Sequence, residues 1–412
     1  MAVAKLAMEL AAVDVRVTKL PLRRPSRHWM VQHFRRFTIL QRRNECFAGL
    51  LEKGSSGGLF GIDYWQATAN TRVTGAVLSV LLKRLVAVRP GLTLDKTTVV
   101  GFSLGAHVAG FTGERLKDPT TGKPLLPLDP AGPLFEDHPP STRLDPSDAQ
   151  FVQCVHTNGR PLYETGCGTM QQMGHADFYA NGGQQQPGCP IVGKRRRHAG
   201  RSLPDPLNVV CNHSRARKLF SDFIRAQQNE ACNGQVIARQ CKDKDDWQSG
   251  NCLHDQTAVI CDTIGYALTA DRNCRGKFWF ATSSERSSEK SVKYVGSQFF
   301  FETIIDNSVV AQLTLRLEFD DGHTTTTDET PLYNLGSLLK GKTAVYVSPP
   351  CTQANLVAIW LQYYNPIPLV ADQIVAKAVS VRDLRGKTYV PFNGSDVVLI
   401  DGTDIRVPMK LA

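Results

Sequence analysis

The sequence lacks long apolar runs and the cysteine spacings of a zinc-binding module. No stretch reaches the roughly 18 consecutive apolar residues that a membrane-spanning helix needs. No two cysteines form a C-x-x-C pair, which argues against a structural zinc finger. The opening MAVAKLAMELAAV is interrupted by Lys5 and Glu9, so it does not match a secretory signal peptide. With 42% hydrophobic and 21% charged residues over 412 positions, the chain is predicted to be globular, with room for two domains.

Positive charge is concentrated at the start of the chain. The formal net charge is +10, and +8 of it falls on residues 1–43, which carry ten Lys or Arg against Glu9 and Asp14. The remaining 369 residues are nearly neutral. A nearly neutral body gives little support to nucleic-acid binding, so no nucleic-acid partner is expected. Residues 1–50 show no clear hydrophobic period and are interpreted as a basic, poorly ordered segment.

The cysteines favour disulfide bonds. Eleven are present, five of them between Cys232 and Cys274, while Cys189 and Cys211 bracket a loop rich in Gly, Pro and Arg. Clustered cysteines around loops are typical of an oxidising compartment, which predicts an extracellular protein. The odd number leaves at least one thiol unpaired.

Periodicity divides the rest of the chain into two parts. Apolar residues at helical spacing predict a helix from Asp63 to Arg89 with an apolar face of Val73, Ala76, Val77, Val80, Leu81 and Leu85. A short buried strand over 97–100 and a helix over 104–116 follow, which is an α/β pattern. From about Phe278 onward, alternating runs at 298–305, 310–319, 342–347, 354–363, 375–381 and 396–400 predict an antiparallel β-sandwich. The expected domains are therefore 51–275 and 276–412.

The motif Gly101-Phe102-Ser103-Leu104-Gly105 lies between this strand and this helix. In a nucleophile elbow the serine occupies a sharp strand-to-helix turn, and side chains two residues away would collide there. A bare G-x-S-x-G is common by chance. Its position between TTVV and LGAHVAG favours a nucleophilic serine over a chance match.

A serine hydroxyl needs a base, and the base needs an orienting acid. Asp129 ends the apolar run LLPLD, and His213 follows a cysteine in CNHS. An Asp before Pro is usually a turn residue, and a single His is usually structural. The order Ser103, Asp129, His213 is the chain order of an α/β-hydrolase triad.

The segments GFSLGAHVAG, LDPAGP, RLDPSDAQFVQCVHTNG, MGHADFYANGGQQQPGC and CNHSRA resemble the pancreatic-type lipase family. The resemblance runs from about Asp63 to the C-terminus. It implies an α/β-hydrolase domain with Ser103 as nucleophile, Asp129 as acid, His213 as base and the Leu104 N–H in the oxyanion hole. It also implies an all-β PLAT-like domain, a lipid–water interface as partner and a colipase-like protein as a further partner.

Asp145 and Asp148, three residues apart, could supply oxygens to a hard cation. Taken alone, the stretch Arg143 to Asp148 favours a turn followed by a helix cap. The family has a structural calcium at this place, and the resemblance assigns it to Asp145 and Asp148 by side chain and to Pro140 and Arg143 by carbonyl.

The resemblance also assigns disulfides and a lid. Residues 190–210, closed by Cys189–Cys211, occupy the lid position, and this length favours a triacylglycerol lipase over a phospholipase A1. Cys241–Cys252 has the spacing of a family disulfide. The next bridge lacks its first cysteine, because Asp255 stands there, and Cys232 is the substitute partner suggested for Cys261.

One part of the family pattern is missing. The family places several strands and a His-Gly-aromatic loop before the nucleophile, and that loop gives the second oxyanion N–H. Residues 1–50 contain no His-Gly pair, so the hydrolase domain is expected to be N-terminally incomplete, with an exposed sheet edge and one oxyanion donor. Two readings follow from the sequence: an interfacial ester hydrolase, or a lipase-fold lipid-binding protein without turnover.

Overall fold

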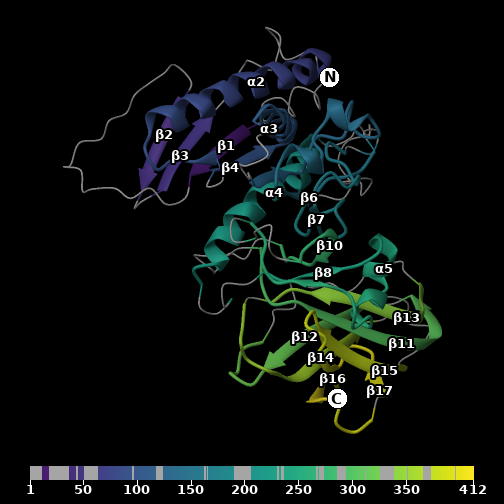
Figure 1. Ribbon diagram of the computed structural model, residues 1–412. Coiled ribbons are helices and arrows are strands. Elements are labelled where there is room, and N and C mark those ends of the chain that lie inside the picture. Colours follow the sequence, from purple (N-terminus) through teal and green to yellow (C-terminus); the bar gives the residue numbers. More distant parts are fainter. Residues whose placement is uncertain are drawn as a thin grey trace. The chain divides into compact units, whose positions relative to one another are not determined.

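A computed structural model describes most of the chain after residue 63 and three strands before it. The described residues are 12–17, 37–42, 45–50, 64–94, 97–116, 124–161, 164, 166–189, 206–229, 232, 236–265, 268, 273–284, 294–310, 312–324, 338–349, 351–364, 373–394 and 396–412. They belong to two compact units (Figure 1). The first comprises 1–224 and 264–278, and the second comprises 225–263 and 279–412. Residues 225–263, expected in the catalytic domain, therefore cluster with the second unit.

A mixed sheet forms the centre of the first unit. Its strand order is β2-β3-β1-β4-β5-β6-β7. The strands are β1 (Ala12–Val17), β2 (Phe37–Arg42), β3 (Glu45–Leu50), β4 (Thr97–Phe102), β5 (Pro124–Leu128), β6 (Phe151–His156) and β7 (Ala176–Ala180). Strands β4 to β7 are parallel, whereas β1 pairs antiparallel with β4 and β3. Strand β1 pairs along the whole of β4, so the strand that leads to Ser103 is not the exposed edge expected from the sequence.

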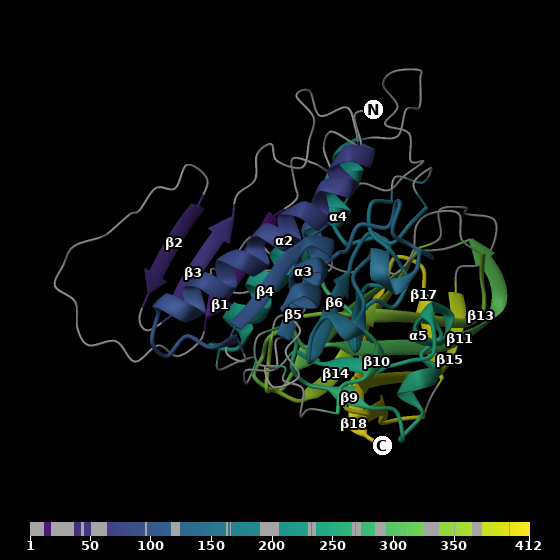
Figure 2. The same ribbon diagram turned by 45° about the horizontal axis from the view of Figure 1, so that its top comes forward.

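Within the described residues, three helices flank this sheet. They are α2 (Tyr64–Val88), α3 (Leu104–Arg115) and α4 (Pro206–Ala226). Helices α2 and α3 lie side by side (Figure 1, Figure 2), and α3 packs on β4 and β5. The approach is close at Gly75, where a Cβ would lie 2.7 Å from the Phe111 Cβ.

The predicted helix 63–89 is present, but its predicted apolar face is wrong. Val73, Val77 and Val80 are exposed, while Leu81 and Leu85 are partly buried. The face that packs inward consists of Ala67, Thr71, Gly75, Leu78, Ser79 and Leu82. Of these residues, only Leu78 and Leu82 are large and apolar. Small residues face inward because α3 lies so close.

The second unit is dominated by antiparallel strands. Its sheet has the order β12-β14-β18-β16-β15-β11-β13, with β17 added on β15. The strands are β11 (Phe299–Val310), β12 (Gln312–Phe319), β13 (Leu338–Val347), β14 (Leu356–Tyr364), β15 (Gln373–Asp383), β16 (Thr388–Pro391), β17 (Val397–Ile400) and β18 (Asp404–Leu411). Alternating side chains of these strands form one core, as in a sandwich. The predicted strands are present, and the sequence missed β16 and β18.

Short elements complete the chain. They are β8 (Ala238–Gln240), α5 (Lys244–Gln248), β9 (Ile260–Cys261) and β10 (Gly276–Phe280), and the single 3₁₀ turns η2 (Pro140–Thr142), η3 (Pro146–Asp148) and η5 (Asn251–Leu253). Among the described helices, none is both long and apolar enough to cross a bilayer.

The disulfides agree with the sequence at two places and differ at a third. Cys189–Cys211 and Cys241–Cys252 are formed. The suggested partner of Cys261 is wrong, because Cys232 is bonded to Cys351, 119 residues away. Cys261 and Cys274 are also disulfide-bonded. Among the described cysteines, Cys154 and Cys167 are free and buried.

Candidate active site

Ser103 occupies a strained turn between β4 and α3. Its φ of 58° and ψ of −123° lie outside the regions that L-residues prefer. Three backbone bonds hold the turn: the Ser103 N–H donates to Leu128 O at 3.1 Å, and Ser103 O accepts the N–H groups of Ala106 at 3.0 Å and Ala131 at 3.3 Å. A Cβ on Gly101 would lie 2.1 Å from the Gly105 carbonyl oxygen. The turn therefore needs the first glycine of the motif for steric reasons.

We expect Gly101→Ala to destabilise the first unit by about 3 kcal/mol or more, since backbone must move to admit the methyl group. The check is a thermal melt with near-ultraviolet circular dichroism. Gly402→Ala is the control: its Cβ would meet nothing within 4 Å, so it carries only the strain of its positive φ, about 1 kcal/mol. Equal loss of stability in both variants would contradict the steric argument.

Asp129 and His213 are in direct contact, although 84 residues separate them. Asp129 follows the carboxyl end of β5, just as Ser103 follows the carboxyl end of the neighbouring β4, and His213 lies on α4. The His213 Nδ1–H donates to Asp129 Oδ2 at 2.6 Å. The other oxygen, Oδ1, accepts the backbone N–H groups of Thr157 at 2.8 Å and Asn158 at 3.1 Å. Asp129 thus orients the imidazole while two backbone donors hold the carboxylate.

The second ring nitrogen of His213 is buried and makes no hydrogen bond. It therefore does not bond Ser103 Oγ in this structure, although the Phe102 ring, next to Ser103 in the chain, lies 4.6 Å from the imidazole ring. With the proton on Nδ1, Nε2 carries the lone pair. The Ser103, Asp129 and His213 side chains are almost fully buried, at 1%, 0% and 0% exposure. Hydrogen bonds of catalytic groups are often completed only when substrate is bound.

Leu104 begins α3 and follows the serine directly. The first N–H groups of a helix have no acceptor within the helix. The end of the helix dipole adds partial positive charge at the same place. The Leu104 N–H is therefore a suitable donor to an oxyanion formed at Ser103.

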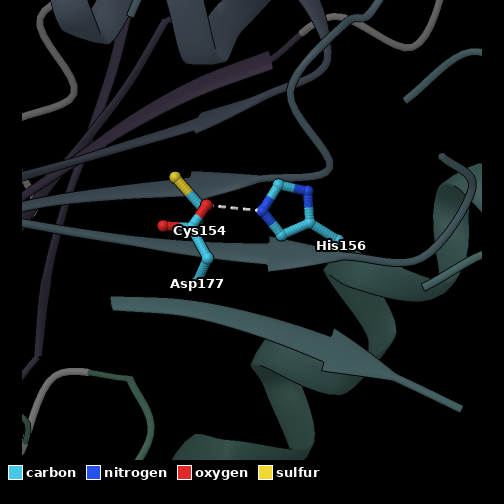
Figure 3. Close-up of side chains that lie close together, drawn as sticks. All are labelled: Cys154, His156 and Asp177. Atoms are coloured by element: carbon cyan, nitrogen blue, oxygen red, sulfur yellow. Dashed lines mark hydrogen bonds and ion pairs between the residues drawn. The ribbon is translucent and has the colours of Figure 1, made fainter. Parts of the chain in front are cut away.

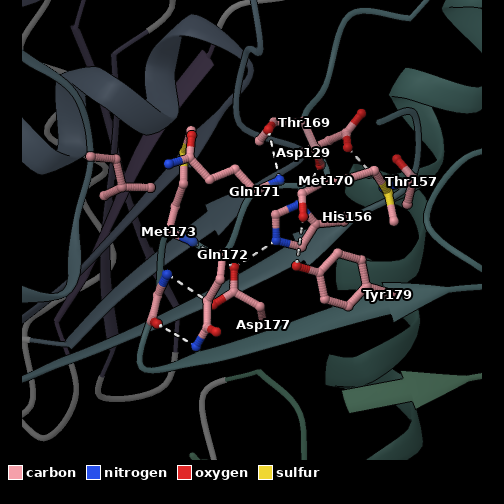
Figure 4. A network of polar contacts seen from close by, with 12 residues as sticks. Asp129, His156, Thr157, Thr169, Met170, Gln171, Gln172, Met173, Asp177 and Tyr179 are labelled. Carbon is pink, nitrogen blue, oxygen red and sulfur yellow. Dashed lines mark hydrogen bonds and ion pairs between the residues drawn. The ribbon is translucent and has the colours of Figure 1, made fainter. Parts of the chain in front are cut away.

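Sequence reasoning missed a buried pair behind Asp129. His156 ends β6, and its Nε2 lies 2.7 Å from Asp177 Oδ1 on β7, while its Nδ1 lies 2.8 Å from Thr169 O (Figure 3, Figure 4). Asp177 also accepts the N–H groups of Met173 and Gly174. The loop held in this way contains Gly168, where a Cβ would lie 2.5 Å from Asp129 Oδ1.

Cys154, His156 and Asp177 lie close enough together to suggest a metal site (Figure 3). Their donor atoms are already engaged: both His156 nitrogens face oxygens of the protein, and Asp177 bonds the ring and two backbone N–H groups. Burial, together with the neighbouring Asp177, raises the pKa of the Cys154 thiol. A protonated thiol is a poor metal ligand, so the cluster is a structural network.

A second missed residue, Gln186, connects both partners of the acid–base pair. Its Nε2 donates to Thr157 O at 3.0 Å, beside the N–H groups that hold Asp129. Its backbone N–H donates at 2.7 Å to the side-chain oxygen of Asn212, the residue before His213. The motif segments containing these residues were visible in the sequence. Their contacts were not, because each joins segments that are distant in the chain.

His107, on α3, is also buried and satisfied. Its ring bonds Ala131 O at 2.9 Å and accepts the Leu144 N–H at 3.1 Å, and it stacks on Phe135. Burial lowers the pKa of His107 to about 3, so the ring is neutral at physiological pH. It anchors the turns that follow Asp129 and precede Asp145.

The residues assigned to calcium form a tight local structure. Asp145 caps η3 by accepting the Ser147 N–H at 2.7 Å, and Asp148 accepts the Asp145 N–H at 3.0 Å. Pro140 O accepts the Arg143 N–H at 3.1 Å. The prediction of a turn followed by a helix cap is therefore confirmed for the backbone of residues 145–148. Carboxylates have two oxygens and carbonyls two lone pairs, so the donor set also fits a hard cation, and calcium stays a prediction.

The expected lid lies mostly outside the described residues. Its disulfide Cys189–Cys211 joins the end of the Gly182–Gly188 stretch to α4, two residues before His213. Residues 190–205 are not among those described. The bridge positions the start of the segment that carries His213.

A strand, a strained serine turn and a helix, together with an acid–histidine pair on neighbouring segments, form the arrangement that is typical of a serine hydrolase on an α/β sheet. A model of the family described as "Lipase" matches residues 58–287, more than half of the chain. The chain belongs to the lipase family.

Relatives agree with this membership. The chain is 34% identical over 232 residues to hepatic triacylglycerol lipase of Mus musculus, covering 56% of this chain and 44% of that protein. It is 33% identical over 272 residues to lipase member H of Rattus norvegicus, covering 64% and 54%. It is 37% identical over 212 residues to putative endothelial lipase of Crotalus adamanteus, covering 52% and 40%. The chain spans about half the length of the curated relatives it matches.

Proposed function

We propose that the chain is a serine hydrolase that cleaves carboxylic esters of lipids. The observation that carries the proposal is the 2.6 Å bond between His213 Nδ1 and Asp129 Oδ2 at the sheet edge that presents Ser103. Family membership gives independent support.

The reaction proceeds through an acyl-enzyme. Once substrate orders the site, His213 Nε2 takes the proton of Ser103 Oγ as the oxygen attacks the ester carbonyl carbon. Asp129 stabilises the imidazolium, and the Leu104 N–H donates to the oxyanion. Collapse breaks the ester bond, and the alcohol leaves with the proton from His213. Water then attacks the acyl group with the same base, which releases the fatty acid and restores Ser103.

Triacylglycerol is the proposed substrate, with phospholipase A1 activity as the alternative. The 21 residues between Cys189 and Cys211 support the first, since a long covering loop is typical of triacylglycerol lipases. A relative named hepatic triacylglycerol lipase points the same way. A lipase member H relative leaves the alternative open.

Several properties of the whole protein follow as part of this proposal. The second unit would act as a PLAT-like domain that contacts lipid or a colipase-like partner. Calcium held by Asp145, Asp148 and the carbonyls of Pro140 and Arg143 would stiffen the turn before β6. The disulfides support an extracellular location.

Lipid binding without turnover is the second candidate. The observation that favours it is the absence of a hydrogen bond between Ser103 and the buried His213 Nε2. In addition, the Leu104 N–H is the only oxyanion donor named in the proposed mechanism. Losing one of two such donors lowers kcat by about 10²–10³.

The test is fluorophosphonate labelling of the folded protein, followed by a lipid panel. We expect covalent labelling, together with release of fatty acid from emulsified triacylglycerol faster than from phosphatidylcholine. Faster release from phosphatidylcholine would assign the phospholipase alternative. If the folded protein binds lipid but is not labelled, the hydrolase proposal is wrong and lipid binding without turnover is the function that fits.

A further inference from the structure

Helix α2 exposes large apolar side chains that face away from the protein, and we call this set, Trp65, Val73, Val77, Val80 and Val88, the stripe. Val73, Val77 and Val80 recur every three to four positions, while Trp65 lies eight residues before Val73 and Val88 eight residues after Val80. All five are largely exposed: Trp65 at 72%, Val73 at 64%, Val77 at 64%, Val80 at 67% and Val88 at 55%. At 1.5 Å per residue, the stripe is about 35 Å long. Most exposed apolar residues of a soluble protein are scattered singly, whereas an aligned row marks an interaction surface.

The stripe is separate from the face that packs on the protein. Leu78 and Leu82 point into the core shared with α3 and β4, and Gly75 abuts Phe111. The Thr112 hydroxyl lies 2.7 Å from Val108 O in its own helix and 3.3 Å from Gly75 O, so the Gly75 face of α2 is held against α3. The exposed valines therefore cannot turn inward without breaking this contact.

Every charged residue of α2, and Arg89 directly after it, is positive. Residues 64–89 contain no Asp or Glu, and Arg72, Lys83, Arg84 and Arg89 are all exposed. An exposed tryptophan, a valine row and flanking cations are the composition of a helix that lies in a membrane interface. The cations would meet phosphate groups while the apolar side chains enter the acyl region.

We propose that α2 is a docking helix for an anionic phospholipid surface. The stripe residues Trp65, Val73, Val77 and Val80 insert, and Lys83 and Arg84 pair with headgroup phosphates. This rests on the proposed function, in that the docked surface would carry the substrate, but docking itself needs no catalysis.

Other occupants fit the charges less well. A second copy would bring an identical basic face against this one, as a twofold interface requires. Residues 1–43 of the same chain carry a charge of +8 and would also be repelled. An anionic surface is attracted by all four cations.

Docking along α2 would act close to the candidate active site. The Tyr64 hydroxyl, at the N-terminal end of the helix, donates to Pro133 O at 3.1 Å. Tyr64 also packs on the cluster that contains Leu104 and Ala131. Trp65 therefore follows directly after Tyr64, which contacts the serine turn and the loop after Asp129.

The experiment measures binding of the full chain to vesicles of phosphatidylcholine alone and of equal parts phosphatidylcholine and phosphatidylglycerol, by co-sedimentation. A Ser103→Ala background keeps the vesicles intact. We expect clear preference for the anionic vesicles, weakened by salt. Val73→Asp/Val77→Asp should lower affinity at least tenfold, because two apolar anchors are lost and two like charges added. Lys83→Glu/Arg84→Glu should lower it about tenfold and remove the preference.

Controls separate docking from folding and from catalysis. Val398→Asp, on an exposed position of β17 in the second unit, makes the same chemical change and should bind as the parent does. The fluorescence of Trp65 should shift to the blue on binding, and Trp65→Phe should abolish that shift. In the Ser103 form, all variants should keep their fluorophosphonate labelling, so loss of docking and loss of the hydrolase are distinguishable.

Three results would overturn the proposal. One is equal affinity of the α2 variants and the parent for anionic vesicles. Another is a lipid-free dimer, seen by light scattering, that Val73→Asp/Val77→Asp dissociates, because that result would assign the stripe to a second copy. The third is binding to polyglutamate as tight as binding to vesicles, which would point to an acidic protein.

Discussion

Ser103→Ala should lower the rate of ester hydrolysis on the order of 10⁵-fold or more, because the variant has no group that can form the acyl-enzyme. Folding should be preserved. The Ser103 side chain makes no capping hydrogen bond to α3, and Ala keeps the backbone bonds to Leu128 and from Ala131. The measurement is fatty-acid release under single-turnover conditions, with fluorophosphonate labelling alongside.

Ser221→Ala is the matched control. This serine, on α4, bonds only a backbone carbonyl, Arg217 O at 3.2 Å, and losing that bond should leave activity within a factor of a few. If Ser103→Ala hydrolysed ester as fast as the parent, the nucleophile would have to be another residue.

Asp129→Asn should lower kcat about 10⁴-fold through the tautomer of His213. The Oδ1 position receives the N–H groups of Thr157 and Asn158, so the amide oxygen of Asn must occupy it. The amide NH₂ then faces His213 Nδ1, which can only accept. The ring proton moves to Nε2, where the lone pair of the base should be.

The effect of Asp129→Asn should fall on kcat far more than on KM, since the substrate does not touch this residue. Asp137→Asn is the control, because Asp137 is exposed and has a positive φ of 60°, which Asn tolerates. Parent-like kcat in Asp129→Asn would remove Asp129 from the proposed mechanism.

Local chemistry made the serine turn predictable. Five consecutive residues determine it, since the steric need for Gly101 and the strand–helix context of Ser103 can both be read within the motif. The Asp129–His213 contact needed the family order, because no local pattern joins residues 84 positions apart.

Features that depend on packing could not be read in this way. The valines of α2 have helical spacing, yet the close approach at Gly75 selects the small-residue face for the core. Cys232 could be seen to need a partner, but Cys351 lies in the other sequence region. The hydrogen bonds of Gln186 and His156 depend on the ends of neighbouring strands, which a linear pattern does not specify.

The antiparallel pairing of β1 has a practical consequence for handling the protein. Ala12 pairs with Phe102, so β1 starts at the end of the sheet where β4 leads into Ser103. A bulky label attached at β1 would therefore lie close to the end of the strands that carries Ser103. Affinity handles and surface-immobilisation chemistry should therefore be kept away from β1 when substrate access is to be measured.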